Sequence, residues 1–172
     1  MTVLHPLQTV HQRPIADICM LLHFGFMTAR AIRLSQGDLR ELTHLLAAAA
    51  LLIDDLKEPG RTFFRLEDDG GLIGYGGWQG CASDRLLRSL SYPPGEARNW
   101  DALGVAIIEQ MALQAGVSRF YLLTDTAAAF FRSAGYQVAD RRDAPQTIRA
   151  SKEFKSLCPA SASYMVKDLE NA

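Results

Sequence analysis

The residues from 85 to 136 constrain the fold of this chain most, because their hydrophobic pattern changes period repeatedly over a short stretch. Arg85–Tyr92 and Phe120–Thr124 are short apolar runs of the kind that form strands. Between them, apolar residues recur at helical spacing over Leu103–Met111, and a second short helix is expected over Thr126–Ala134. The order is therefore strand, loop, helix, strand, helix, and any fold proposed for the chain has to contain that unit.

The size and composition of the chain are those of one globular domain. It has 172 residues, of which 48% are hydrophobic and 22% charged, and its net charge is −1. This length supports a single full core. The net charge gives no electrostatic reason to expect nucleic acid. The apolar stretch Ile15–Met27 is shorter than the roughly 20 residues that span a bilayer. We expect neither nucleic acid nor a membrane as a partner.

Cysteine usage indicates a reducing compartment. Cys19, Cys81 and Cys158 are far apart and odd in number, and none belongs to a C-x-x-C pair. Such a set favours neither a disulfide framework nor zinc, and it gives no reason to place the three thiols together. We therefore expect a cytoplasmic protein without a metal site.

Residues 1–26 differ from the rest of the chain. They contain His5, His11 and His23, whose spacings match no metal-ligand pattern. The stretch that follows resembles a domain start, so we divide the chain into an N-terminal extension and a single domain, 27–172. The extension is either the product of an early start codon or an arm that packs on the domain or on a partner subunit. In the second case we expect a homodimer in which the arm covers the neighbour's cleft.

Further elements follow from periodicity and turn signals on either side of the central unit. Ser35 and Asp38 stand where a helix needs its N-cap. Gly74, Gly76 and Gly77 fall inside an expected strand, which predicts close approach of another part of the chain. The expected strands are Ala29–Leu34, Thr62–Glu67, Leu72–Trp78 and Ala160–Leu169, and the expected helices are Leu39–Ala50 and Pro145–Leu157.

The strand Arg85–Tyr92 carries an arginine between leucines. Period-two alternation predicts one face with Leu86, Arg88, Leu90 and Tyr92, and another with Leu87, Ser89 and Ser91. An arginine in that setting needs a partner. Arg88 either binds the carboxylate of an amino-acid-like substrate, which a guanidinium clamps with two hydrogen bonds, or pairs internally with an acid such as Asp84 or Glu67.

Six short motifs, in order and at matching spacing, resemble the GNAT superfamily of acetyltransferases, and within it the arsenic-resistance-type N-acetyltransferases. They lie at Glu58–Phe64, Gly74–Gly77, Leu86–Leu90, Tyr121–Thr124, Phe130–Tyr136 and Phe154–Ala162. The resemblance covers roughly residues 27–169. It implies a mixed α/β fold with a largely antiparallel central sheet of six to seven strands flanked by helices. It also implies transfer of an acetyl group from acetyl-CoA to the amine of a small molecule.

The resemblance further implies how the acetyl group is activated. In this family the strand before the cofactor loop splays from its neighbour, and a backbone N–H near its end polarises the thioester carbonyl. Leu90, Ser91 and Tyr92 occupy that place. Many members place a tyrosine as general acid where this chain has Phe131, which has no proton to give. Tyr92 is our substitute for the acid, and Tyr136 is expected to pack in the core.

The cofactor loop departs from the family pattern. Members carry R/Q-x-x-G-x-G/A there, and glycines let the backbone approach the pyrophosphate. Aligned one way, Arg98 takes the leading basic position, and Asn99, Trp100 and Asp101 stand where glycines are expected. Aligned without a gap, Arg98, Trp100 and Ala102 replace the pattern, and neither register restores it. Asp101 would repel a phosphate by about 4 kcal/mol at ~4 Å and an effective dielectric near 20. It is also a good N-cap for the next helix. We expect weakened acetyl-CoA binding.

Two functions remain open from the sequence. The first is a cytoplasmic N-acetyltransferase acting on a small amine, which the resemblance over most of the chain favours. The second is an acetyltransferase-like binding or regulatory protein without catalysis, which the altered loop and Phe131 favour. Fold analogy alone does not choose between them.

Overall fold

A computed structural model describes residues 20–24, 27–48, 51, 53–80, 83–93, 100–157 and 159–169. Within these ranges the strands form one sheet of eight, in the order β1-β2-β3-β4-β5-β6-β8-β7. Neighbouring strands are antiparallel except for β5 and β6, which are parallel. The predicted fold class, a largely antiparallel sheet flanked by helices, is confirmed. The sheet exceeds six or seven strands because β1 and the two-residue β7 were not expected.

The elements follow the order anticipated for residues 85–136 and extend it on both sides. The strands are β1 (Met20–Phe24), β2 (Met27–Arg33), β3 (Arg61–Asp68), β4 (Gly71–Gln79), β5 (Asp84–Ser91), β6 (Arg119–Thr124), β7 (Gln137–Val138) and β8 (Ser163–Asp168). The helices are α1 (Leu39–Ala48), α2 (Trp100–Gln114), α3 (Ala128–Ser133) and α4 (Gln146–Arg149), joined by a 3₁₀ turn at Arg141–Asp143 and a π-helical turn at Glu153–Leu157.

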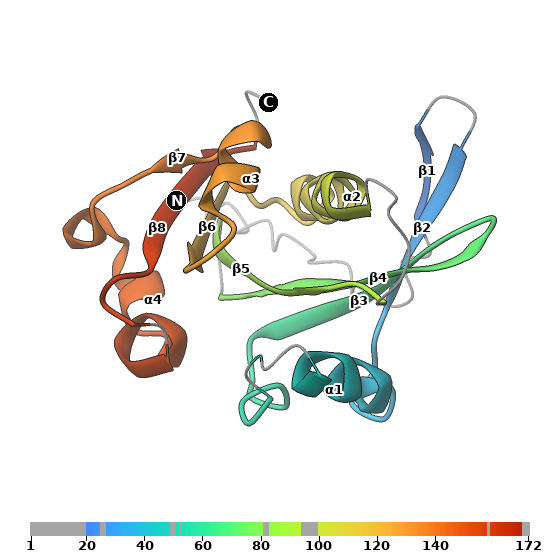
Figure 1. The fold of residues 1–172 in the computed structure, drawn as a ribbon, viewed down its shortest axis with the longest axis horizontal. Coiled ribbons are helices and arrows are strands. Elements are labelled where there is room, and N and C mark those ends of the chain that lie inside the picture. Colours follow the sequence, from blue (N-terminus) through green and yellow to red (C-terminus); the bar gives the residue numbers. More distant parts are fainter. Residues whose placement is uncertain are drawn as a thin grey trace, which may run out of the picture.

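Helices cover both faces of the sheet (Figure 1). Helix α2 lies on one face and α1 on the other, with β3, β4 and β5 between them. The larger core lies under α2, where Ile107, Ile108 and Met111 are buried against the sheet. A smaller core lies under α1 and contains Leu42 and Leu46. The apolar positions that predicted the two helices are thus the positions that bury them.

Local chemistry at two places agrees with the sequence-based expectations. Ser35 donates from its backbone N–H and its hydroxyl to the Asp38 carboxylate, which fixes the turn into α1. The glycines of β4 have neighbours too close for a side chain: a Cβ at Gly77 would lie 2.2 Å from the Thr62 carbonyl oxygen, and one at Gly74 2.5 Å from the Ser91 carbonyl oxygen.

The expected alternation along β5 is wrong beyond Arg88. Ser89 has a φ of 58°, and the register with β4 shifts so that Ser89 and Leu90 together face Gly76. This is a β-bulge, in which the extra residue turns the rest of the strand over. Leu90 and Tyr92 therefore join Leu87 in the core under α2, while Arg88 faces the opposite side.

The single helix expected over Pro145–Leu157 is also wrong. Helix α4 ends at Arg149, and the Ser151 hydroxyl then accepts a hydrogen bond from the Phe154 N–H to start a separate turn. A serine side chain that bonds its own backbone in this way competes with helix continuation. The break carries Glu153 toward β5.

Strand β1 forms an antiparallel hairpin with β2, and Met20 pairs with Ala31. The boundary that we proposed between an extension and a domain therefore falls between two paired strands. Among the described residues, no helix is long and apolar enough to cross a membrane, and no three His, Cys, Asp or Glu side chains gather as a metal site requires. The side chains of the three early histidines, and the three cysteines, lie outside the described residues.

Candidate active site

The parallel strands β5 and β6 separate soon after they begin. They pair only from Asp84–Leu86 to Arg119–Tyr121, and beyond that point β6 pairs with β8 alone. The space between Leu87–Leu90 of β5 and Leu122–Thr124 of β6 is a cavity of about 370 Å³, closed further by α3. We call it the β5–β6 cleft. The splay that the resemblance implied is confirmed, and it occurs where the central strands would otherwise continue their ladder.

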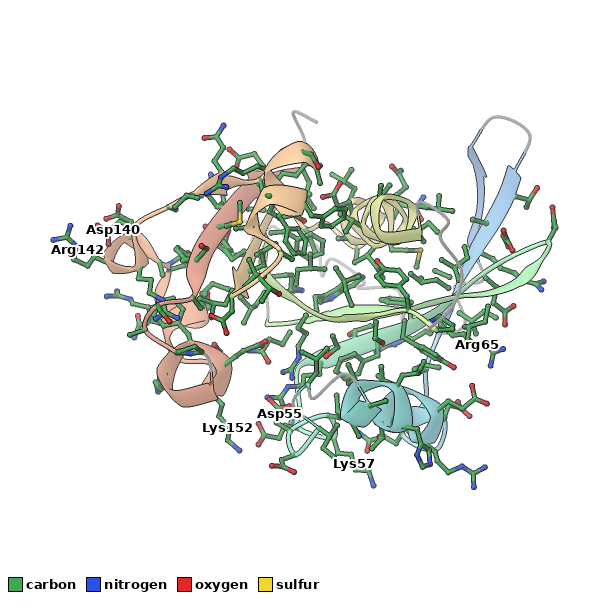
Figure 2. The ribbon with its side chains drawn as sticks, in the orientation of Figure 1. Asp55, Lys57, Arg65, Asp140, Arg142 and Lys152 are labelled. Atoms are coloured by element: carbon green, nitrogen blue, oxygen red, sulfur yellow. The ribbon has the colours of Figure 1, made fainter. Side chains whose placement is uncertain are left out.

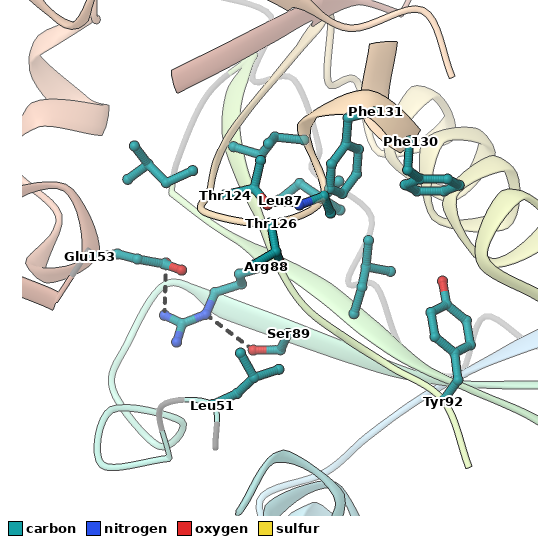
Figure 3. Close-up of a pocket in the computed structure, with 14 residues that line it drawn as sticks. Leu51, Leu87, Arg88, Ser89, Tyr92, Thr124, Thr126, Phe130, Phe131 and Glu153 are labelled. Carbon is teal, nitrogen blue, oxygen red and sulfur yellow. Dashed lines mark hydrogen bonds and ion pairs between the residues drawn. The ribbon is translucent and has the colours of Figure 1, made fainter. Parts of the chain in front are cut away.

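The cleft has an apolar side and a polar end (Figure 3). Phe130 and Phe131 of α3 lie on the apolar side, whereas Arg88 and Glu153 meet at the polar end. Tyr92 lies on the side of the cleft away from Glu153. Such a space, mostly apolar with a few polar groups, is the usual form of a small-molecule site.

The structure brings part of the predicted site together. Arg88, Leu90, Tyr92 and Phe131 line the cleft. Ser91 is buried beside it, and its hydroxyl makes no hydrogen bond within the described part of the chain.

The structure gives little information on the predicted cofactor-loop residues. Ala102 is exposed in the first turn of α2 and does not line the cleft. Arg98 and Asn99 lie outside the described residues. Trp100 and Asp101 begin α2, but their side chains also lie outside what the structure describes. The predicted cofactor-binding role of these residues stays a prediction.

Arg88 has an internal partner that the sequence did not indicate. Its Nη1 and Nη2 donate to the two Asp55 carboxylate oxygens at 3.0 and 2.7 Å, and Nη1 also donates to Gln79 Oε1 at 2.6 Å. The Arg88 and Asp55 side chains are only 2% and 3% exposed. Asp55, rather than Asp84 or Glu67, neutralises this buried arginine. A contact of Arg88 with a substrate carboxylate stays a prediction.

Asp55 is held in its charged form. Burial raises the pKa of its carboxyl, but hydrogen bonding and charge attraction from Arg88, followed by the charge of Arg61, bring the pKa below its ordinary value. Arg61 Nη2 lies 2.8 Å from Asp55 Oδ2. A carboxylate between two guanidinium groups is a stable bridge between β3 and β5.

The ion pairs continue from Arg61 to the segment that follows α4. Arg61 also pairs with Glu58 at 2.9 Å, and Glu58 pairs with Lys152 in the segment after α4. Figure 2 shows Asp55 and Lys152 on segments that face each other, although they lie far apart in the sequence. We call Asp55, Glu58, Arg61, Arg88, Lys152 and Glu153 the cleft network.

Glu153 and Arg88 are the two members of this network that line the cleft. Glu153 Oε2 lies 3.7 Å from Arg88 Nη1, beyond hydrogen-bond distance, and that oxygen is buried without a hydrogen bond among the described residues. Burial raises the pKa of Glu153; Arg88 opposes this, and Asp55 adds to it. Sequence reasoning missed Glu153 because it lies in a segment that resembled an uninterrupted helix.

Tyr92 is fixed by close packing against α2. A Cβ at Gly104 would lie 2.6 Å from the Tyr92 hydroxyl oxygen, so a side chain at that helix position and this ring placement exclude each other. Phe131 packs edge-on against Tyr136, with ring centroids 5.4 Å apart. Tyr136 is buried in the core under α2, and burial together with Glu109 raises its pKa well above the usual range. Its predicted packing role agrees with this position.

Solved structures with the same arrangement are acetyltransferases. N-acetylglutamate synthase from Neisseria gonorrhoeae, complexed with coenzyme A and N-acetyl-glutamate, aligns with 86% of this chain at a TM-score of 0.64 and 22% identity. An acetyltransferase of the GNAT family from Staphylococcus aureus aligns with 82% of this chain and 99% of its own length, at a TM-score of 0.60 and 16% identity. This chain has the GNAT fold.

The same fold is found in the ribosomal-protein-S18-alanine N-acetyltransferase from Escherichia coli, which aligns with 82% of this chain and 94% of its own length at a TM-score of 0.58 and 17% identity. The chain spans only 36% of the length of the gonococcal synthase. No protein-family model matches the sequence, and no curated protein matches it. The GNAT fold is therefore established by structure, at identities that do not carry an activity across.

Proposed function

We propose that this chain is an N-acetyltransferase that moves an acetyl group from acetyl-CoA to the amine of a small molecule. The observation that carries the proposal is the separation of β5 from β6 beside the bulge at Ser89 and Leu90. Beyond Leu86, β5 no longer pairs with β6, so the backbone groups on that edge of β5 are open to the cleft instead of being bonded to a neighbouring strand. Backbone N–H groups aimed at a developing oxyanion are a common means of acyl-transfer catalysis.

The cleft suits the two reactants chemically. Its apolar side, which includes Leu122 and Phe131, fits the acetyl group and the thioester end of the cofactor arm. In the reaction the neutral amine nitrogen attacks the carbonyl carbon and loses a proton, the carbon–sulfur bond breaks, and the thiolate takes a proton. An acceptor that is bound as an ammonium first releases one proton. We assign the polarising backbone to Leu90, Ser91 and Tyr92, and the proton to the Tyr92 hydroxyl.

Acetyl-CoA binding is the first step to test. Isothermal titration with acetyl-CoA, with CoA as a comparison, should give micromolar dissociation constants if the loop before α2 holds the pyrophosphate. Release of the CoA thiol in the presence of a panel of amines then reports transfer. Absence of release with every amine, despite cofactor binding, would contradict the proposal.

The alternative is a binding or regulatory protein that uses the same cleft without catalysis. The loop residues Asn99, Trp100 and Asp101, where the family has glycines, support it. Replacing Asn99 and Asp101 with glycine separates the two functions. Tighter acetyl-CoA binding in this variant indicates that the loop alone limits an otherwise competent cleft, whereas unchanged millimolar or absent binding favours the alternative.

The finer assignments rest on sequence motifs. The resemblance to arsenic-resistance-type enzymes, the cytoplasmic location and the homodimer belong to this proposal and not to the fold. An amino-acid-like acceptor would have to place its carboxylate at Arg88, the cation that lines the cleft among the described residues.

A further inference from the structure

The polar end of the β5–β6 cleft holds a carboxylate oxygen that lacks a hydrogen-bond partner. Glu153 Oε2 is buried, lies 3.7 Å from the nearest guanidinium nitrogen of Arg88, and accepts no hydrogen bond from the described residues. Buried polar atoms are nearly always paired, because an unpaired one forfeits about 1–3 kcal/mol. Glu153 also lines the cleft, so a ligand is the natural donor for its carboxylate.

Arg88 is not available to a ligand in the same way. A guanidinium has five N–H donors. Both donors on Nη1 are taken by Asp55 and Gln79, one on Nη2 is taken by Asp55, and Nε points to the Ser89 hydroxyl at 3.4 Å. The positive charge is balanced by Asp55 at 2.7 Å. One N–H of Nη2 is left over, so a two-bond clamp of a substrate carboxylate on Arg88 would displace Asp55, which would then be left with Arg61 alone.

The charges around the cleft end therefore favour one kind of ligand group. The cleft network contains three cationic and three acidic side chains, and five of the six have an ion partner closer than 3 Å. The exception is Glu153. The six charges balance, so the preference comes from position: an incoming ammonium would donate to Glu153 Oε2, which accepts no hydrogen bond from the described residues, whereas an incoming carboxylate would meet the Glu153 carboxylate at the cleft wall.

We infer that Glu153 binds the amino group of the acceptor, and that the acceptor is a small amine with an apolar body and no carboxylate beside its amino group. The inference rests on the proposed function and narrows its substrate class. Arg88 is then a positioning residue, because it holds its charge next to Glu153 without contacting the acceptor. The apolar body lies along the leucine and phenylalanine side chains of the cleft.

Matched pairs of compounds test the inference. Phenethylamine and phenylalanine differ by the carboxylate alone, as do isoamylamine and leucine. Each is titrated into the purified full chain by calorimetry, with and without CoA, and each is assayed by CoA release from acetyl-CoA. The variants are Glu153→Gln, which keeps the shape and removes the charge, and Glu41→Gln, which removes an exposed carboxylate that belongs neither to the cleft network nor to the cleft lining.

We expect each amine to bind and react at least ten-fold better than its amino acid. Glu153→Gln should weaken amine binding by about ten- to a hundred-fold, as expected for loss of a charge-assisted hydrogen bond. It should leave acetyl-CoA affinity unchanged, and Glu41→Gln should behave as the wild type. Equal or better binding of the amino acids, binding of neither compound, or full amine affinity in Glu153→Gln overturns the inference.

The calorimetry separates this result from the fate of the proposed function. Amine binding that depends on Glu153, in a chain that neither binds nor cleaves acetyl-CoA, would retain the ligand class and reject catalysis. Acetyl transfer to amino acids in preference to amines would retain catalysis and reject the ligand class.

Discussion

At the scale of single residues, we expect Asp55 to matter for stability, because its carboxylate neutralises two buried arginines. We expect Asp55→Asn to lower the free energy of unfolding by about 3 kcal/mol, since removing one partner of a buried ion pair leaves an uncompensated charge. Urea denaturation followed by tryptophan fluorescence measures this change.

The neighbouring Asp54 provides the matched control, because it is exposed and stands one position away in the same turn. Asp54→Asn should change the unfolding free energy by no more than about 0.5 kcal/mol. Equal effects of the two substitutions would contradict the buried bridge.

Tyr92 is the residue on which the proposed chemistry depends. If its hydroxyl protonates the leaving thiolate, Tyr92→Phe should lower kcat by roughly 100-fold or more, because a positioned general acid contributes that order. The calorimetric Kd for acetyl-CoA should not change. Tyr164→Phe, which also removes a buried hydroxyl but lies outside the cleft, is the control. Unchanged kcat in Tyr92→Phe would remove Tyr92 from the mechanism.

At the scale of elements, α2 and the end of β5 are coupled through Gly104. Alanine normally stabilises a helix by about 1 kcal/mol relative to glycine. Here a Cβ would meet the Tyr92 ring and hydroxyl, so we expect Gly104→Ala to give no such gain and to lower kcat. In a Tyr92→Ala background the same substitution should stabilise by about 1 kcal/mol. A double-mutant cycle by urea denaturation measures the difference, and additivity of the two changes would contradict the coupling.

Most of the fold could be predicted from the sequence because periodicity and turn residues are local signals. The helix under which Leu42 and Leu46 are buried, and the close approach at Gly77, follow from spacing alone. The bulge at Ser89 could not be predicted, since it depends on how β5 meets Gly76 of another strand. The pairing of Arg88 with Asp55 joins residues 33 positions apart and has no local signal.

Glu153 shows the same limit in the candidate site. Its segment has helical composition, and the helix is interrupted where the Ser151 hydroxyl accepts a hydrogen bond from the Phe154 N–H. The cleft itself is a tertiary feature, because it exists where β5 and β6 stop pairing. The sequence thus indicated which strands form the site, whereas the acid at its polar end required the structure.

At the scale of the whole molecule, strand β1 is the edge strand on its side of the described sheet, and it covers the longer strand β2. Its pairing with β2 occupies backbone groups of that longer strand that would otherwise be open to another chain. A chain that starts at Met27 should therefore associate, and static light scattering should report a larger mass than for the full chain. If residues 1–26 instead act as an arm that holds a homodimer together, the same truncation should lower the mass, and that result would contradict the edge-protection role.

The free energy of unfolding should depend on pH through the carboxyl group of Glu153. Burial raises its pKa above the ordinary 4.5, so the native state holds the proton more tightly than the unfolded chain. Stability from this group is therefore present below the unfolded pKa and is lost as pH rises through the folded pKa. Glu153→Gln removes that loss.

The variant should have a higher Tm than the wild type at neutral pH, and the difference should vanish below about pH 4, where the carboxyl is protonated in both states. Calorimetric scans at both pH values test this. A Glu153→Gln variant that is less stable at neutral pH would mean that attraction to Arg88 outweighs burial.

The bulge at Ser89 also sets a limit on how this protein can change. Side chains alternate between the two faces of a strand, so one extra residue moves every later side chain to the opposite face. Pairing Ser89 as a regular strand residue would exchange the places of Leu90 and Ser91 along the rest of β5, whereas deleting Ser89 would keep both on their present faces. Apart from loss of Ser89 itself, insertions or deletions in this strand should therefore be far less tolerated than substitutions, because they alter the main core and the cleft wall in a single event.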